Sequence, residues 1–316
     1  MSINQLSTPI LLLAFNRPEV TQQVFDEIKK IKPLKLYIAI DGPRETIPDD
    51  ILKIQIVRNI ITSIDWNCEL YELIQDKNLG CKNAVSSAIS WFFEHEEQGI
   101  ILEDDCLPHP DFFSYCEKML EYYKMNESVM AITGDNFQDG QVRGSGSYYF
   151  SKYNHVWGWA TWSRAWKHYD KEIKFWPKWK KSGHLNQFFP TKIEKKYWSV
   201  IFDRVFVNGI DTWDYQWTAC VWFNNGITVT PNVNLVSNIG FGSDATHTTD
   251  STSPYSGKQT QSMTQIIHPD EVKVDIAADD YAFMNALGGK NLYLKARIIR
   301  KIKSYFSKIF PGSIIF

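Results

Sequence analysis

Short apolar runs alternate with amphipathic stretches through the first 139 residues of the chain. Residues 10–15 are continuously apolar over the length of a strand, which is typical of a strand covered on both faces. Apolar residues then recur at helical spacing from Val20 to Ile31, and Pro33 ends that helix. We expect the same alternation to give strands at 36–40, 68–74, 99–102 and 129–133 and helices at 50–64, 83–94 and 111–124. This succession predicts an α/β fold with a mostly parallel, Rossmann-like sheet and helices on both faces.

The pattern changes from residue 140 onward. Residues 157–222 contain ten of the chain's 12 tryptophans. The turn-forming residues 224–226 separate two apolar triplets, 221–223 and 227–229, which predicts two strands around a turn. A stretch rich in serine and threonine, 243–265, predicts a loop. We therefore divide the chain into two halves of one domain, 1–139 and 140–290, and a tail, 291–316.

Composition narrows the class of protein. With 44% hydrophobic residues in 316, the chain is long enough for one large folded domain. The formal net charge of -2 provides no overall basic field for nucleic acid, so we expect no nucleic-acid partner. The five cysteines have no CxxC spacing, which favours reduced thiols and a cytoplasmic location. No apolar run reaches the roughly 18 residues that a membrane-spanning helix needs.

Three consecutive acids, Glu103, Asp104 and Asp105, follow the predicted strand 99–102 directly. In open α/β sheets ligands bind at the carboxyl ends of the strands. Carboxylate oxygens there favour a hard divalent cation such as Mn²⁺ or Mg²⁺, with a diphosphate completing its shell. The alternative is a solvated turn that caps the helix beginning near Pro110.

The segment 103–113 resembles the Glu-Asp-Asp region of GT-A glycosyltransferases of the N-acetylglucosaminyltransferase I type, in which Pro-Asp-Phe-Phe also follows closely. The resemblance extends more loosely from residue 9 to about 247. It implies that Asp105 binds the metal, that Glu103 lies near the donor sugar and that Asp104 contacts ribose or sugar. The two halves would then bind the nucleotide sugar and the acceptor, in an inverting transfer to a hydroxyl of a glycan or lipid-linked acceptor.

Three residues of the first half are candidates for the nucleotide. Asp41 resembles the family's acid that accepts from the uracil imide, which makes a UDP-linked donor the expected one. Arg17, after the first strand, offers a guanidinium to a phosphate or ribose, although it could equally be a surface residue before a proline-started helix. Lys82, at the start of helix 83–94, is a weaker candidate for a donor contact.

The second half supplies candidates for the acceptor side. Trp213-Asp214-Tyr215-Gln216-Trp217 resembles the family's Trp-Asp-Asp-Trp segment, which implies Asp214 as the catalytic base. Asp211 is the alternative base, and Asp214 could instead cap a helix. Trp157 or Trp159 would stack on a sugar ring, and His247 would touch the diphosphate or metal unless it is merely solvated.

From 292 to 316 the tail contains six basic residues and no acids, with apolar residues at helical spacing. Such a basic amphipathic helix either docks on an anionic inner membrane leaflet or packs on the domain. Membrane docking would suit a lipid-linked acceptor and polysaccharide biosynthesis.

Two other functions compete with glycosyl transfer. A sugar-phosphate nucleotidylyltransferase shares the nucleotide-binding architecture and acidic metal site, but needs a glycine-rich first loop where residues 15–18 contain no glycine. A non-catalytic carbohydrate-binding protein would explain the tryptophans but not the acidic triplet.

Overall fold

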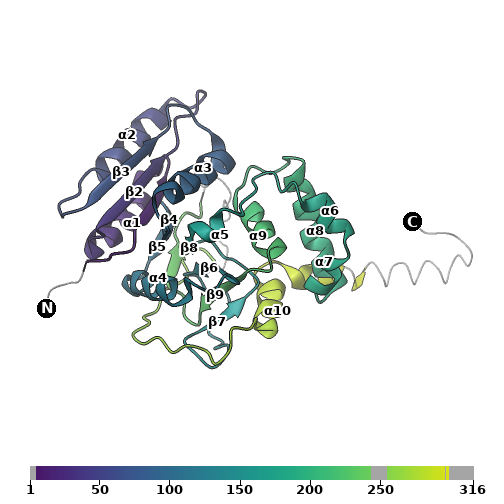
Figure 1. Cartoon of the computed structure of the whole chain (residues 1–316). Coiled ribbons are helices and arrows are strands. Elements are labelled where there is room, and N and C mark those ends of the chain that lie inside the picture. The colour runs from purple at the N-terminus through teal and green to yellow at the C-terminus, as the bar shows by residue number, and fades with distance from the viewer. Residues whose placement is uncertain (1–4, 243–254, 296, 299–316) are drawn as a thin grey trace, which may run out of the picture.

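The computed structural model describes residues 5–242, 255–295 and 297–298 (Figure 1). Eight strands form one sheet in the order β3-β2-β1-β4-β8-β6-β9-β7. Their bounds are β1 Ile10–Ala14, β2 Lys35–Ile40, β3 Glu69–Ile74, β4 Gln98–Glu103, β6 Val129–Thr133, β7 Tyr148–Ser151, β8 Trp159–Trp162 and β9 Ile227–Pro231. The pairs β3-β2, β2-β1, β1-β4 and β6-β9 are parallel, whereas β8 and β7 run antiparallel to their neighbours. The expected α/β fold with a mostly parallel sheet is confirmed.

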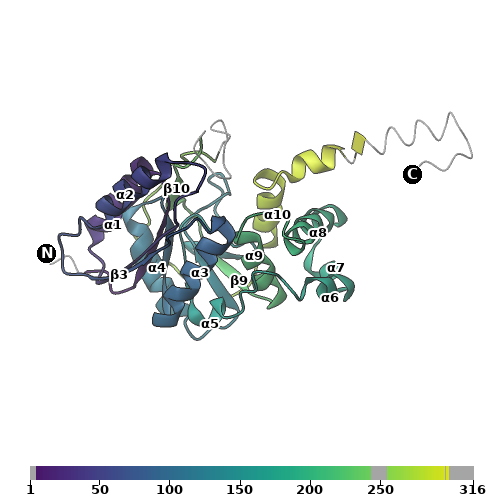
Figure 2. The same ribbon diagram turned by 90° about the horizontal axis from the view of Figure 1, so that it is seen from above.

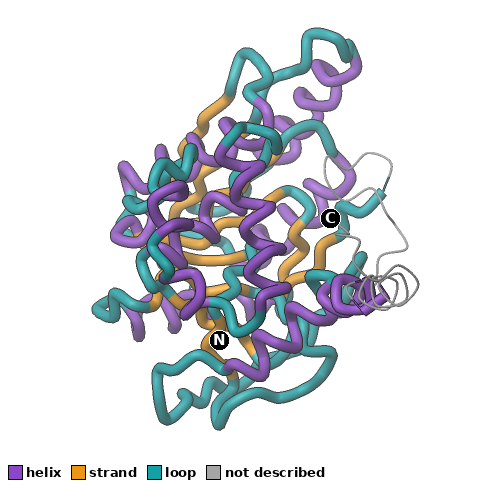
Figure 3. The backbone as a smooth tube through the Cα atoms, turned by 90° about the vertical axis from the view of Figure 1, so that its right-hand side faces the viewer, coloured by secondary structure: helices purple, strands orange, loops and turns teal. Residues whose placement is uncertain are grey.

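Both faces of the sheet are covered, as the apolar strands predict. In β1, Ile10 and Leu12 belong to one hydrophobic core, and Leu11 and Leu13 to the other, because successive side chains of a strand point to opposite faces. The first core is formed with α1 (Pro18–Ile31), α2 (Asp49–Ile61) and α4 (Pro110–Tyr123). The second is formed with α3 (Gly80–His95), α5 (Ser163–Trp166) and α9 (Asp214–Phe223). Figure 2 shows these two helical layers on either side of the sheet, and Figure 3 shows the strands between them.

A helical lobe lies beside the second core. It consists of α6 (Trp176–Lys181), α7 (His184–Phe188) and α8 (Lys192–Phe206), with α10 (Ile276–Asn285) close by (Figure 1). Its tryptophans are mostly buried packing residues. A buried ion pair ties it to the end of β7, because the Lys152 ammonium lies 2.6 Å from Glu194 of α8. Both expected halves contribute strands to the eight-stranded sheet and residues to each of the two cores.

One sequence-based expectation is wrong. Residues 221–223, expected as a strand, are the last turn of α9, whereas the second expected strand is present as β9. Residues 216–222 are all buried, and a helix that is apolar on every side cannot be told from a buried strand by periodicity. The expected turn residues end the helix instead: Asn225 adopts a left-handed φ of 54° and the Gly226 N–H donates to the Val221 carbonyl.

A small second sheet lies next to the acidic triplet. It pairs β5 (Cys106–Pro108) with β10 (Val236–Asn238) in antiparallel orientation. The Ile239 N–H extends this pairing by donating to the Asp105 carbonyl at 2.9 Å. Residues 236–240 are thereby fixed against the end of β4.

The described part of the tail is helical up to residue 298. Leu292 and Tyr293 pack against the second core, whereas Leu294 and Ile298 are exposed. Across the described residues, no helix has both the length and the apolar character to span a bilayer. The remainder of the predicted amphipathic helix lies outside the described residues.

Candidate active site

The predicted nucleotide residues meet at one edge of the sheet. β1 pairs in parallel with β2 on one side and β4 on the other, with Ala14 opposite Ile40 and Leu13 opposite Glu103. The strands therefore end side by side, and the loops that follow carry Arg17, Asp41 and the acidic triplet. The chain reverses its strand order between β1 and β4, and ligands of open α/β sheets bind at such a switch point.

A cavity of about 280 Å³ opens at this edge. Its walls include five of the predicted site residues: Arg17, Asp41, Glu103, Asp104 and Asp211. Phe15, Arg44 and Asn78 also line it. The volume is near the lower end of the roughly 300–1,000 Å³ range of small-molecule sites.

Arg17 neutralises part of the acidic triplet. Its Nη1 donates to Asp105 Oδ2 at 2.9 Å, and its Nη2 donates to Asp104 Oδ1. Burial alone would lower the pKa of Arg17, but attraction to these carboxylates outweighs it and raises the pKa. Burial raises the pKa of Asp104. The triplet is thus a buried anionic cluster with one built-in cation, and Arg17 is not the exposed surface residue of the alternative interpretation.

Glu103 is the third acid of the cluster. Burial, followed by repulsion from Asp105 and Asp104, raises the pKa of Glu103 to about 8. The side chain is therefore mostly protonated at neutral pH, and it faces the cavity as a potential hydrogen-bond donor.

The triplet fits a divalent cation only in part. Asp104 and Asp105 offer the oxygen ligands that Mn²⁺ and Mg²⁺ prefer, and the Asp105 carboxylate lies against the backbone of Gly240, where an added Cβ would approach Oδ2 to 2.0 Å. However, no group of three or more His, Cys, Asp or Glu side chains with metal-binding geometry occurs in the described ranges. A cation held at Asp105 would need ligand oxygens from a bound phosphate or from water.

Asp41 is fixed by the loop that precedes α3. Its Oδ1 accepts from the backbone N–H groups of Gly42 and Leu79 at 2.8 and 2.9 Å, and its Oδ2 accepts from Asn78 Nδ2 at 2.9 Å. A further backbone hydrogen bond, from Gly80, also reaches this carboxylate, so protein donors occupy the roughly four acceptor positions of the group. Burial raises the pKa of Asp41.

The start of α3 already has an anion. Asp211 accepts from the backbone N–H groups of Cys81 and Lys82 at 3.2 and 3.0 Å, which satisfies donors that a helix leaves unpaired at its N-terminus. The Lys82 ammonium binds Glu172 and Asn208 at 3.0 and 2.6 Å, and Lys82 is not among the residues that line the first cavity. The structure thus gives Asp211 a helix-capping role and turns Lys82 away from its predicted donor contact.

A second cavity, of about 310 Å³, contains the predicted acceptor residues Asp214 and Trp157. Asp214 is the first residue of α9, and its Oδ1 accepts from the Thr212 hydroxyl. Repulsion from Asp214 contributes to the raised pKa of Glu103. The acids of the two cavities are therefore within electrostatic reach of each other. Trp159 is instead buried and stacks on Trp213 at 5.6 Å between ring centroids, so it is a core residue.

The wall of the second cavity includes two polar residues that the sequence analysis did not identify, Asp135 and Asn154. β6 runs in the same direction as β4, because both are antiparallel to β8. Asp135, two residues beyond β6, therefore reaches the same edge of the sheet as the triplet. An acid just after a buried strand was the available signal, as it was for Glu103.

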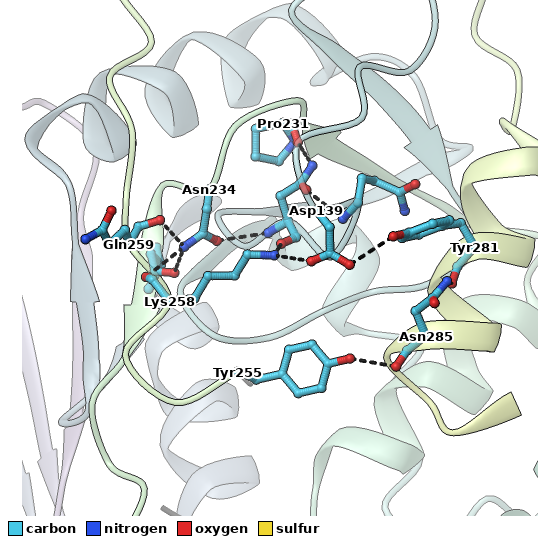
Figure 4. A network of polar contacts seen from close by, with 11 residues as sticks. Asp139, Pro231, Asn234, Tyr255, Lys258, Gln259, Tyr281 and Asn285 are labelled. Atoms are coloured by element: carbon cyan, nitrogen blue, oxygen red, sulfur yellow. Dashed lines mark hydrogen bonds and ion pairs between the residues drawn. The ribbon is translucent and has the colours of Figure 1, made fainter. Parts of the chain in front are cut away.

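His247 lies outside the described residues. The described chain resumes at Tyr255, and Figure 4 shows the polar contacts of Tyr255, Lys258 and Gln259. Lys258 Nζ donates to the Asn136 carbonyl at 2.8 Å and lies 3.2 Å from Asp139, while Tyr255 donates to the Asn285 carbonyl at 2.7 Å. These contacts fix one side of the second cavity, which Tyr255 lines.

Comparisons with known proteins give distant likenesses only. No protein-family model and no curated protein matches the chain. HddC from Yersinia pseudotuberculosis is 11% identical over 54% of this chain and 86% of that one, with a TM-score of 0.32. A UDP-glucose pyrophosphorylase complexed with UDP-glucose is 12% identical over 47% of this chain and 65% of its own, with a TM-score of 0.27. The inositol-1-phosphate CTP transferase from T. maritima is 11% identical over 51% and 73%, with a TM-score of 0.32. The latter two titles name nucleotidyltransferases, but TM-scores this low carry no argument about the reaction.

Proposed function

We propose that the chain is a glycosyltransferase of the GT-A kind, which takes a sugar from a nucleoside diphosphate sugar, with UDP as the expected nucleotide. The observation that carries the proposal is a pair of cavities whose acids are within electrostatic reach of each other. One lies at the nucleotide edge of the sheet and contains Arg17, Asp41 and Glu103. The other is lined by aromatic rings and by Asp214, whose charge reaches Glu103. Two sites joined through acids suit a transfer between two substrates better than the binding of one ligand.

The proposed roles follow from these positions. Asp41 would accept from the imide of uracil in place of one of its protein donors, and Arg17 would bind the diphosphate. A divalent cation held at Asp105, when bound, would offset charge on the leaving diphosphate. Asp104 would remain paired with Arg17, and Glu103 would donate a hydrogen bond to a hydroxyl of the donor sugar. Asp214 would remove the proton of the acceptor hydroxyl as it attacks the anomeric carbon.

Nucleotidyl transfer is the second candidate, because that reaction also needs a nucleotide-binding sheet edge with an acidic metal site. It would use the same first cavity. The loop after β1 argues against it, since residues 15–18 contain no glycine to wrap a triphosphate. It also leaves the second cavity and Asp214 without a part in the reaction. A carbohydrate-binding protein without activity would use the second cavity alone.

Calorimetry with UDP, CDP, GDP and ADP, each with and without Mn²⁺, tests the nucleotide site. We expect Mn²⁺-dependent binding with a preference for UDP, because a carboxylate at Asp41 finds no N3 proton on cytosine. Asp105→Ala should abolish the Mn²⁺ dependence, and Asp41→Ala should cost about 1–3 kcal/mol and flatten the preference. The exposed Asp76 provides the matched control, since Asp76→Ala should change neither. Equal affinity of the unmutated protein for UDP and CDP would remove the role of Asp41.

A further inference from the structure

A buried amide in the second cavity has no partner. Asn154 is 7% exposed, and neither its Nδ2 nor its Oδ1 makes a hydrogen bond within the described residues. Buried polar side chains in proteins are nearly always paired. The preceding side chains obey that rule, because Lys152 and Tyr153 both bind Glu194, at 2.6 and 2.5 Å. Asn154 departs from that rule at both polar atoms of its side chain, and it lines the cavity.

A second unpaired group shares this cavity. Asp135 is 2% exposed, and its carboxylate interacts with the Thr133 hydroxyl through Oδ1 and with the backbone N–H of Trp157. Its Oδ2 has no partner with good hydrogen-bond geometry among the described residues. Burial raises the pKa of Asp135 to about 7. Together with Asn154, it places two acceptor oxygens and one amide donor in the wall of the cavity.

The rest of the wall is aromatic. Phe137 contacts His155, Trp157 and Tyr255, with ring centroids 4.4, 5.5 and 5.3 Å apart. Burial lowers the pKa of His155 to about 3, so its ring is neutral. Flat apolar faces beside a few unpaired polar atoms match a pyranose ring, which has C–H faces and hydroxyls at its rim.

We propose that Asn154 and Asp135 form a subsite for a sugar ring of the acceptor, with Asn154 selecting the arrangement of its hydroxyls. This inference rests on the proposed glycosyl transfer and assigns the acceptor to the carbohydrates. An acyl chain would leave both polar side chains unpaired, which costs binding free energy. A phosphate group would face the carboxylates of Asp135 and Asp214.

The test uses the full chain, saturated with the nucleoside diphosphate that it binds best. Methyl glycopyranosides of glucose, galactose, mannose and N-acetylglucosamine are titrated by ligand-detected NMR, with n-octanol as an acyl-chain probe. We expect at least one glycoside to bind in the millimolar range and Asn154→Leu to weaken it at least tenfold. The exposed Asn186 provides the control, since Asn186→Leu should bind as the unmutated protein does. Binding of octanol alone, no glycoside binding, or equal binding by Asn154→Leu would overturn the proposal.

The unfolding temperature of Asn154→Leu tests the same proposal independently of binding. An amide without a partner in the protein can be replaced by leucine of similar size at no cost, so Asn154→Leu should unfold at or above the temperature of the unmutated protein. A lower midpoint, or a failure to fold, would show that the amide has a structural role and would overturn the proposal. Nucleoside diphosphate binding separates the two proposals: its absence refutes the proposed donor site, whereas Asn154-dependent glycoside binding still supports the sugar subsite.

Discussion

Arg17 and a divalent cation should compete for the same carboxylates. Arg17→Met removes the guanidinium from Asp104 and Asp105 and leaves two buried acids next to Glu103. Removing one partner of a buried ion pair costs about 3–5 kcal/mol. The side chain of Arg17 is 21% exposed, so we expect the lower end, about 3 kcal/mol. For a chain of 316 residues that corresponds to a fall in the unfolding midpoint of about 4–5 °C.

Mn²⁺ should restore much of that loss. A ligand at 100 times its Kd stabilises the folded state by about 2.7 kcal/mol, and in Arg17→Met the cation meets no competing guanidinium. Differential scanning calorimetry with and without Mn²⁺ should therefore show a larger Mn²⁺ shift for Arg17→Met than for the unmutated protein. Arg44 provides the matched control, because it pairs with the buried Asp50 at 2.7 Å and not with the triplet. Arg44→Met should be destabilised but not rescued. Equal Mn²⁺ shifts in all three proteins would refute the competition, and an undiminished midpoint for Arg17→Met would refute the charge argument.

Three further predictions concern the site and the core. Gly240→Ala should weaken Mn²⁺-dependent UDP binding by about tenfold or more in calorimetry, because the new Cβ would lie 2.0 Å from Asp105 Oδ2; unchanged binding would show that the contact with Asp105 is unimportant. Burial raises the pKa of Asp279 to about 7, so the folded state retains a proton that the unfolded chain releases near pH 4. Urea unfolding should therefore show a free energy of unfolding that falls from about pH 4 to 7, and this fall should be smaller in Asp279→Asn. Asp214→Asn should lower slow donor hydrolysis by about two to four orders of magnitude, whereas Asp211→Asn should act mainly on stability; the reverse result would make Asp211 the base.

The sequence predicted the parts of the fold that depend on local pattern. The strands ending at Ala14, Ile40 and Glu103 are continuous apolar runs, and the helices between them have clear amphipathic spacing or end signals. The antiparallel insertion of β8 between β4 and β6 has no local signature, since strand order depends on long-range packing. The end of α9, residues 221–223, was expected as a strand because residues 216–222 are all buried and show no helical periodicity.

In the candidate site, too, some residues could be predicted from local pattern and others depend on tertiary contacts. Arg17, Asp41 and Glu103 were predictable because each follows the end of a buried strand, where α/β sheets bind ligands. Lys82 sits at the predicted helix start, but tertiary partners decide where its ammonium points. Asp211 and Trp159 carried the right chemistry for the site and are held by capping and core packing instead. Asn154 was missed because an unpaired amide can be recognised only once its surroundings are known.

The identity of the broken bond distinguishes glycosyl transfer from nucleotidyl transfer. The protein is incubated with Mn²⁺ and a panel of UDP-sugars, with and without pyrophosphate, and products are separated by ion-exchange chromatography. Glycosyl transfer breaks the bond at the anomeric carbon, so we expect UDP and free sugar to form from at least one donor. Their formation should not depend on pyrophosphate and should be lost in Asp105→Ala. Formation of UTP and sugar 1-phosphate, only when pyrophosphate is added, would contradict it and identify nucleotidyl transfer.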